Sequence, residues 1–102
     1  MKQATLIRPD NSPRERKRIA YEYTGFNHAT LVEAIRAGWA VNDEFCRLDG
    51  VHSVAANERV PSTLDFLRDH VHLTERGRRA LAAAVYEAVA EWVERIRAPK
   101  GS

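Results

Sequence analysis

The sequence is poor in the features that mark disulfide-stabilised, secreted and membrane-spanning proteins. Its single cysteine, Cys46, cannot form a disulfide within the chain, which excludes the framework of a small secreted domain. No run approaches the ~20 apolar residues that a membrane-spanning helix needs. The first residues are not followed by an apolar run of signal-peptide length, so nothing here directs export, and a cytoplasmic location is favoured.

Charge of one sign is also scarce, since sixteen Lys and Arg stand against fourteen Asp and Glu for a net charge of +2. The basic excess gathers at residues 14–18, which read Arg-Glu-Arg-Lys-Arg. Such a cluster can be a phosphate-binding patch and is more commonly a solvated helix face. Because so small a net charge releases few counterions, nucleic-acid binding is not expected.

What is present suits one globular domain. The chain has 102 residues, of which 44% are apolar and 29% charged. Residues 4–7 form a short apolar run before a turn sequence at 9–11, which predicts a buried strand. Ser12, followed by a proline and by Glu15, predicts a helix N-terminus of the capping-box kind.

The middle of the chain predicts a helix, a strand and a loop. Asn27 can cap a stretch whose apolar residues recur at three- and four-residue intervals as far as Trp39. Residues 45–48 predict a second short strand, closed by Asp49 and a glycine. Residues 50–63 lack any sustained periodicity and predict a loop.

The C-terminal segment carries the clearest helical pattern. Thr74 can cap it, alanines raise its helix propensity, and Pro99 is expected to end it. One apolar stripe runs along the segment and consists of Leu81, Val85, Val89, Trp92, Val93 and Ile96. Self-association through this stripe is the partner interaction that the sequence predicts.

Strands that alternate with helices indicate a parallel sheet with helical cover, so the predicted fold class is α/β with a short parallel sheet, flanking helices and a long C-terminal helix. Two strands make a poor sheet. Residues 1–102 are predicted to form a single domain, and the resemblance described below implies that this domain is incomplete.

The stretch 69–77 offers the most specific chemistry, and it reads Asp-His-Val-His-Leu-Thr-Glu-Arg-Gly. It places Asp69 three residues before His72, in a loop that enters the final helix. A carboxylate that accepts the hydrogen bond of Nδ1–H fixes the imidazole tautomer and leaves Nε2 free as a base. Gly77, in the first turn, would let the helix approach a neighbouring backbone closely.

The pattern Asp-x-x-His-x-Thr-x-x-Gly before an Ala- and Leu-rich helix resembles the C-terminal block of the SGNH (GDSL-type) esterases and lipases. The order of elements over residues 3–95 is similar too. The resemblance implies part of a flavodoxin-like, three-layer α/β domain, with Asp69 orienting His72 as the general base of a Ser-His-Asp triad. It also implies a small ester substrate and no metal or organic cofactor. Leu73 departs from the family, which often has proline after the histidine.

The nucleophile block of that family does not occur in this sequence, which contains no Gly-Asp-Ser and no Gly-x-Asn-Asp. The resemblance therefore implies the C-terminal part of an ester hydrolase, with a serine supplied by another segment and little activity from this chain alone. Ser12 loosely mimics a nucleophile turn, but its neighbours favour a helix cap. Ser53 and Ser62 lie in the predicted loop without supporting neighbours.

Two other interpretations of the same stretch remain open. Asp69, His70 and His72 would permit a catalytic zinc site with an open fourth position, although no further Cys or His cluster supports it. Residues 73–81 also resemble the segment in which the wing of winged-helix transcription regulators returns into a long helix. That DNA-binding alternative needs a recognition helix before the wing, and residues 50–68 have a broken pattern instead.

Overall fold

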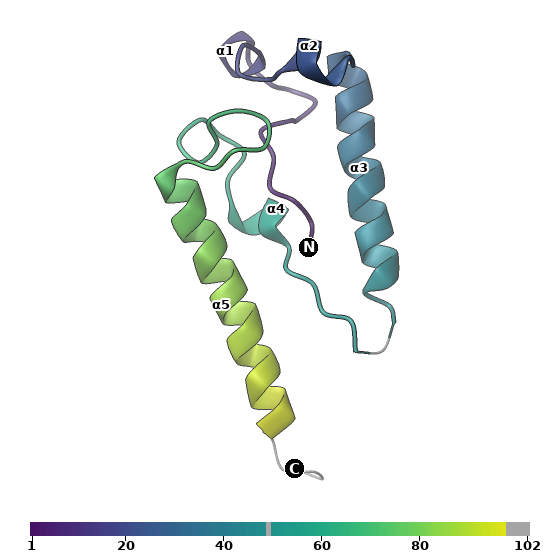
Figure 1. Cartoon of the computed structure of the whole chain (residues 1–102), viewed down its shortest axis with the longest axis vertical. Coiled ribbons are helices and arrows are strands. Elements are labelled where there is room, and N and C mark those ends of the chain that lie inside the picture. The colour runs from purple at the N-terminus through teal and green to yellow at the C-terminus, as the bar shows by residue number, and fades with distance from the viewer. Residues whose placement is uncertain (49, 98–102) are drawn as a thin grey trace.

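The computed structural model describes residues 1–48 and 50–97, and it is built mainly from helices (Figure 1). Helix accounts for 55% of the structure and strand for 4%. The helices in chain order are α1 (Pro13–Arg16), α2 (Tyr21–Thr24), α3 (His28–Phe45), α4 (Ala56–Arg59) and α5 (Glu75–Arg97). Only α3 and α5 are long, and they lie on either side of the N-terminal segment.

The predicted α/β fold, with its parallel sheet in a three-layer arrangement, is wrong. Within the ranges that the structure describes, strand-like pairing is limited to two isolated bridges, a parallel one between Lys2 and Ala55 and an antiparallel one between Leu67 and Leu73. A sheet needs several strands in register, and a single bridge supplies none of that continuity. The long C-terminal helix, in contrast, is confirmed.

Residues 4–7 are buried, as predicted, but they form no strand. Leu6 is fully buried, and Ala4, Thr5 and Ile7 are nearly so. Helices rather than strands flank the segment on both sides (Figure 1). The indole Nε1–H of Trp39 in α3 donates to the Gln3 carbonyl at 3.2 Å, where a sheet would place a neighbouring strand.

The second predicted strand, at residues 45–48, is also wrong. Phe45 is the last residue of α3, and the N–H of Cys46 still donates to the Asn42 carbonyl at 3.1 Å. Phe45 and Leu48 are more than half exposed, so this apolar run is not a core strand. Asp49, which was expected to close the strand, lies outside the described residues.

The predicted helix starts are confirmed. The Ser12 hydroxyl accepts a hydrogen bond from the Glu15 N–H at 3.2 Å, and the Glu15 carboxylate accepts one from the Ser12 N–H at 2.9 Å, which completes a capping box. The Asn27 side chain caps α3 by accepting from the Thr30 N–H at 2.9 Å. The predicted loop at 50–63 is irregular except for the single turn of α4.

The core forms around the N-terminal segment in two clusters. The first, which reaches toward α3, comprises Leu6, Ile7, Ile19, Leu31, Val32 and Leu67. The second, which joins α4 to the first half of α5, comprises Ala4, Ala56 and Val60 with the partly buried Phe66, Leu73, Ala80 and Leu81. Buried residues 4–7 therefore connect the two long helices.

The second half of α5 leaves this core. Its stripe residues Val85, Val89, Trp92 and Ile96 are between 37% and 64% exposed. Pro99, which was expected to end the helix, lies outside the described residues. No helix in the described ranges is both long and apolar enough to cross a membrane.

Candidate functional site

The Asp69–His72 stretch forms the tip of a tight hairpin that leads into α5. The Arg68 N–H donates to the His72 carbonyl at 2.8 Å, and the Thr74 N–H donates to the Phe66 carbonyl at 3.0 Å. Leu67, at the base of the hairpin, is fully buried in the first core cluster. The backbone of the tip is thus held by hydrogen bonds from both sides and anchored by a core residue.

The hairpin brings the two residues of the predicted pair together. Nδ1 of His72 lies 2.9 Å from Oδ2 and 3.1 Å from Oδ1 of Asp69. These distances are within hydrogen-bond reach, which is the geometry that the triad interpretation requires. The catalytic role of the pair stays a prediction, because contact alone does not establish chemistry.

Asp69 is fixed by the backbone as well as by the imidazole. Its Oδ1 accepts hydrogen bonds from the N–H groups of Val71 at 2.9 Å and His72 at 2.7 Å. Partial burial by itself would raise the pKa of Asp69, but these two backbone bonds, together with the His72 ring and its charge, lower the pKa to about 2. The carboxylate is therefore ionised at neutral pH, as an orienting group must be.

The other side of the imidazole is open to solvent. A carboxylate can only accept a hydrogen bond, so Nδ1 carries the proton and the neutral ring presents an unprotonated Nε2. The His72 side chain is 74% exposed. Nε2 is thus available to accept a proton from a group that approaches from outside the chain.

The start of α5 is fixed closely behind the pair. The Thr74 hydroxyl accepts from the Gly77 N–H at 3.1 Å and donates to the Asp65 carbonyl at 2.7 Å, which confirms it as the N-cap. A Cβ on Gly77 would lie 2.0 Å from the Phe66 carbonyl oxygen. The predicted close approach of this helix to a neighbouring backbone is confirmed.

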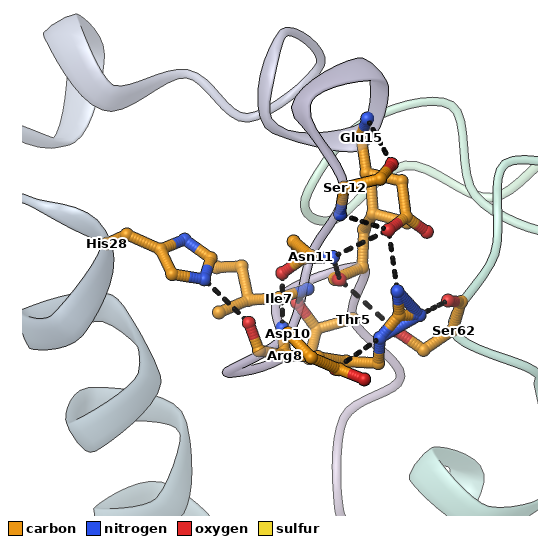
Figure 2. A network of polar contacts seen from close by, with 10 residues as sticks. Thr5, Ile7, Arg8, Asp10, Asn11, Ser12, Glu15, His28 and Ser62 are labelled. Atoms are coloured by element: carbon orange, nitrogen blue, oxygen red, sulfur yellow. Dashed lines mark hydrogen bonds and ion pairs between the residues drawn. The ribbon is translucent and has the colours of Figure 1, made fainter.

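A polar network follows the buried N-terminal segment (Figure 2), and one bond joins this segment to the hairpin. Thr5 contributes the direct link, because its hydroxyl donates to the His70 carbonyl at 2.8 Å. Asn11 folds the chain back on itself, donating to the Leu6 carbonyl at 2.8 Å and accepting from the Arg8 N–H at 2.6 Å. The sequence pattern gave no signal for the Thr5–His70 bond, which joins residues far apart in the chain.

Arg8 and Glu15 lie at the centre of this network (Figure 2). The Arg8 guanidinium donates to the Glu15 carboxylate at 2.6 Å and also to the Ser62 carbonyl. Burial would raise the pKa of Glu15, but the Ser12 N–H, the Asn11 amide and Arg8 outweigh it and lower that pKa. The network is structural, since each side chain in it is hydrogen-bonded within the fold.

The three serines of the described ranges are engaged away from His72. Ser12 caps α1 as predicted. The Ser53 hydroxyl bonds to the side chain of Asn42, and the Ser62 hydroxyl donates to the Leu6 carbonyl at 3.1 Å. None of them therefore stands as the partner that the general base would activate.

His28 is the other histidine with defined hydrogen bonds, and it borders a hollow of about 660 Å³ at the start of α3. Its Nδ1 lies 2.8 Å from the Tyr21 hydroxyl, and its Nε2 lies 2.6 Å from the Arg8 carbonyl. Both ring nitrogens of His28 are thus bonded within the fold, so this histidine is not free to act as a base in the larger hollow.

The zinc-site and winged-helix interpretations gain no support from the structure. Across residues 1–48 and 50–97, no group of three or more His, Cys, Asp or Glu side chains could hold a metal ion, so Asp69, His70 and His72 do not converge on one. The stretch 50–68 contains only the four-residue α4, too short to serve as a recognition helix in a DNA groove.

Basic side chains lie next to the Asp69–His72 pair, and the sequence did not predict this arrangement. A hollow of about 500 Å³ is lined by Asp69 and His72 together with Lys17, Arg18 and Arg68. The basic stretch 14–18 was identified from the sequence, but its position beside the Asp–His pair depends on tertiary packing. The available sequence signal was Arg68, which directly precedes Asp69.

No family model, curated protein or solved structure matches this chain significantly.

Proposed function

We propose that this chain carries the general-base half of a serine ester hydrolase of the SGNH type. The observation that carries the proposal is the contact at 2.9 Å between Asp69 Oδ2 and His72 Nδ1, in a histidine whose side chain is 74% exposed. The motif Asp-x-x-His-x-Thr-x-x-Gly supports it, because the Asp69 carboxylate bonds the ring as the resemblance implies. Thr74 caps α5 and Gly77 makes a close backbone approach, so the start of the helix is fixed next to the pair.

In this proposal another polypeptide segment supplies the serine and the oxyanion hole. His72 Nε2 takes the serine proton as the serine oxygen bonds to the ester carbonyl carbon. When the bond from that carbon to the leaving alcohol breaks, the imidazolium returns the proton to the alcohol oxygen. Water then cleaves the acyl-serine by the same proton transfers. Asp69 keeps the ring oriented and stabilises its charged form throughout.

The first experiment concerns the chain as it stands. Incubation with a fluorophosphonate probe is expected to leave Ser12, Ser53 and Ser62 unlabelled, because their hydroxyls are hydrogen-bonded elsewhere in the fold. Robust labelling of Ser12, Ser53 or Ser62 would contradict the statement that the nucleophile comes from elsewhere.

The second experiment measures the base directly. Long-range ¹H–¹⁵N correlation of the histidine rings is expected to find the His72 ring, once neutral, protonated at Nδ1 and unprotonated at Nε2. Asp69→Asn should weaken this preference, since the amide NH₂ cannot accept from Nδ1–H. The His28 ring, whose partners lie elsewhere, is the internal control. A His72 ring protonated at Nε2 in the unmodified chain contradicts the proposal.

The third experiment adds the missing half. A segment that carries a Gly-Asp-Ser block, taken from any reading frame upstream of Met1 that encodes one, is expressed together with this chain, and hydrolysis of p-nitrophenyl esters is measured. We expect activity that His72→Ala lowers by at least about 10³-fold, as for other triad histidines. Activity unaffected by His72→Ala would exclude the assigned base.

A further inference from the structure

Two adjoining hollows beside the Asp69–His72 pair are lined by basic side chains. The first, of about 500 Å³, has Lys17, Arg18 and Arg68 next to the pair. The second, of about 370 Å³, is lined by Arg14, Arg18, Leu64, Leu67, Arg68 and Thr74. Arg18 and Arg68 border both hollows, so four cations from two distant segments frame one continuous region.

The fold holds these two segments together. Ile19 and Leu67 are buried in the same core cluster, and they are the chain neighbours of Arg18 and Arg68. The Arg18 N–H donates to the Glu15 carbonyl at 2.9 Å, and the Arg68 N–H donates to the His72 carbonyl at 2.8 Å. The backbones that carry the two guanidinium groups are therefore fixed, although the side chains themselves are exposed.

No carboxylate neutralises these cations. Within residues 1–48 and 50–97, Arg14, Lys17, Arg18 and Arg68 make no ion pair, whereas Arg8, Arg59, Arg79 and Arg95 each have an acidic partner. Asp69 is the one carboxylate among the lining residues, and its oxygens already accept from His72 and the backbone. The residues that line the two hollows carry four positive charges and one negative charge. Their combined net charge is therefore larger than the net charge of +2 of the whole chain.

We infer that this region binds the phosphate group of an ester substrate, and that this contact places the neighbouring ester bond at His72. Guanidinium groups pair with phosphate oxygens through two parallel hydrogen bonds, so Arg18 and Arg68, which both line the two hollows, suit a tetrahedral dianion. The placement of the ester rests on the proposed function, but the binding of the phosphate group does not.

Inorganic phosphate is the first probe, titrated into the whole chain at low ionic strength and followed by NMR. We expect saturable shifts confined to the signals of Arg18, Arg68 and His72. Arg18→Gln or Arg68→Gln should each weaken binding about ten-fold or more, since a charge-assisted hydrogen bond is lost. Arg47→Gln removes the same charge two residues beyond the end of α3, at a residue that lines neither hollow, and should leave the affinity within two-fold. Equal weakening by Arg47→Gln, or no saturable shift, overturns the inference.

Three further probes identify the source of the phosphate. Glycerol 3-phosphate is expected to compete with inorganic phosphate at the same residues. Preferential binding to vesicles of phosphatidylglycerol in phosphatidylcholine, or to a DNA duplex, would overturn the assignment to a small ester. Neither phosphate binding nor the His72 tautomer needs a nucleophile, so the two proposals can fail separately. If phosphate does not bind while the His72 ring is still protonated at Nδ1, only the inference about the phosphate region is contradicted.

Discussion

Asp69 has two separable roles, one toward the backbone and one toward an imidazole. Its Oδ1 accepts from the Val71 and His72 N–H groups, and this would hold the hairpin even without the ring. Asp69→Ala removes the side-chain acceptor of both N–H groups and is expected to destabilise the fold by about 1–2 kcal/mol, as loss of a side-chain cap does. Asp69→Asn keeps a carbonyl oxygen that can accept from the two backbone N–H groups. It should therefore lower the free energy of unfolding, measured by urea denaturation, by less than about 1 kcal/mol. Equal losses in the two variants would contradict the separation.

The lowered pKa of Asp69 predicts a specific acid sensitivity. Because the pKa in the folded chain, about 2, is below the ordinary value of 3.8, the ionised carboxylate stabilises the fold. This contribution is complete above about pH 4 and is lost as the pH falls toward 2. The side chain is 33% exposed, so we expect only about 1 kcal/mol after solvent screening.

The measurement is the free energy of unfolding of the chain and of Asp69→Asn, taken between pH 5 and 2. The difference between the two should shrink as the pH falls, while the effect of other carboxylates such as Glu15 cancels in the subtraction. A difference that is constant over this window would contradict the assigned role of Asp69.

Position 77 requires glycine because α5 passes close to the backbone of Phe66 there. A methyl group there would lie 2.0 Å from the Phe66 carbonyl oxygen, which is backbone and cannot turn aside. Gly77→Ala should therefore cost about 2–3 kcal/mol, as overpacking of a tight contact does. Gly38→Ala is the matched control, because nothing lies within 4 Å of its added Cβ and it is exposed in α3. The control should stabilise the chain by about 0.5–1 kcal/mol in thermal denaturation.

The single-residue predictions from the sequence that succeeded depended on local geometry. Ser12, Asn27 and Thr74 act as caps through bonds to residues three positions away, so the pattern contained both partners. The contact of Asp69 with His72 is of the same kind. The Thr5–His70 bond spans 65 positions and depends on packing that no local pattern encodes.

At the scale of elements, the sequence predicted the helices better than the strands. A strand is stabilised by a partner strand, and residues 4–7 find helices on both sides instead (Figure 1). Residues 45–48 follow α3 with no helix breaker before Gly50, so the helix runs through Phe45 and ends in turns. A short apolar run predicts burial or helix continuation as readily as a strand, and only tertiary packing decides between them.

The capping box of α1 gives a prediction at this scale. Ser12→Ala removes the acceptor of the Glu15 N–H and should destabilise the chain by about 1 kcal/mol. Ser12→Asn retains a capping oxygen and should cost only a few tenths of that amount. The two variants are compared by urea denaturation, and a cost from Ser12→Asn as large as that from Ser12→Ala would indicate that the cap itself contributes little.

The whole molecule exposes more surface than its mass requires. Its accessible area is 7503 Å², whereas a compact monomer of 11.6 kDa exposes about 5,800 Å². Its radius of gyration is 16.2 Å, against about 13 Å for a compact domain of this length. The excess, roughly 1,700 Å², is the size of one side of an obligate interface. Exposed apolar residues of α5 and of the end of α3 contribute to it.

Self-association is the expected behaviour of the isolated chain, because a stripe of exposed apolar side chains such as that of α5 favours association in water. Sedimentation velocity should detect species heavier than 11.6 kDa, in a fraction that rises with concentration. Val89→Glu combined with Ile96→Glu places charges on the exposed stripe and should shift the chain toward monomer. Ala83→Glu, on another face of α5, should not, since residues 83 and 89 are separated by about 120° around a helix with 3.6 residues per turn. A chain that sediments as a monomer at every concentration would contradict the role of this stripe. If Ala83→Glu also dissociates the chain, the added charge and not its position on the helix face controls the association.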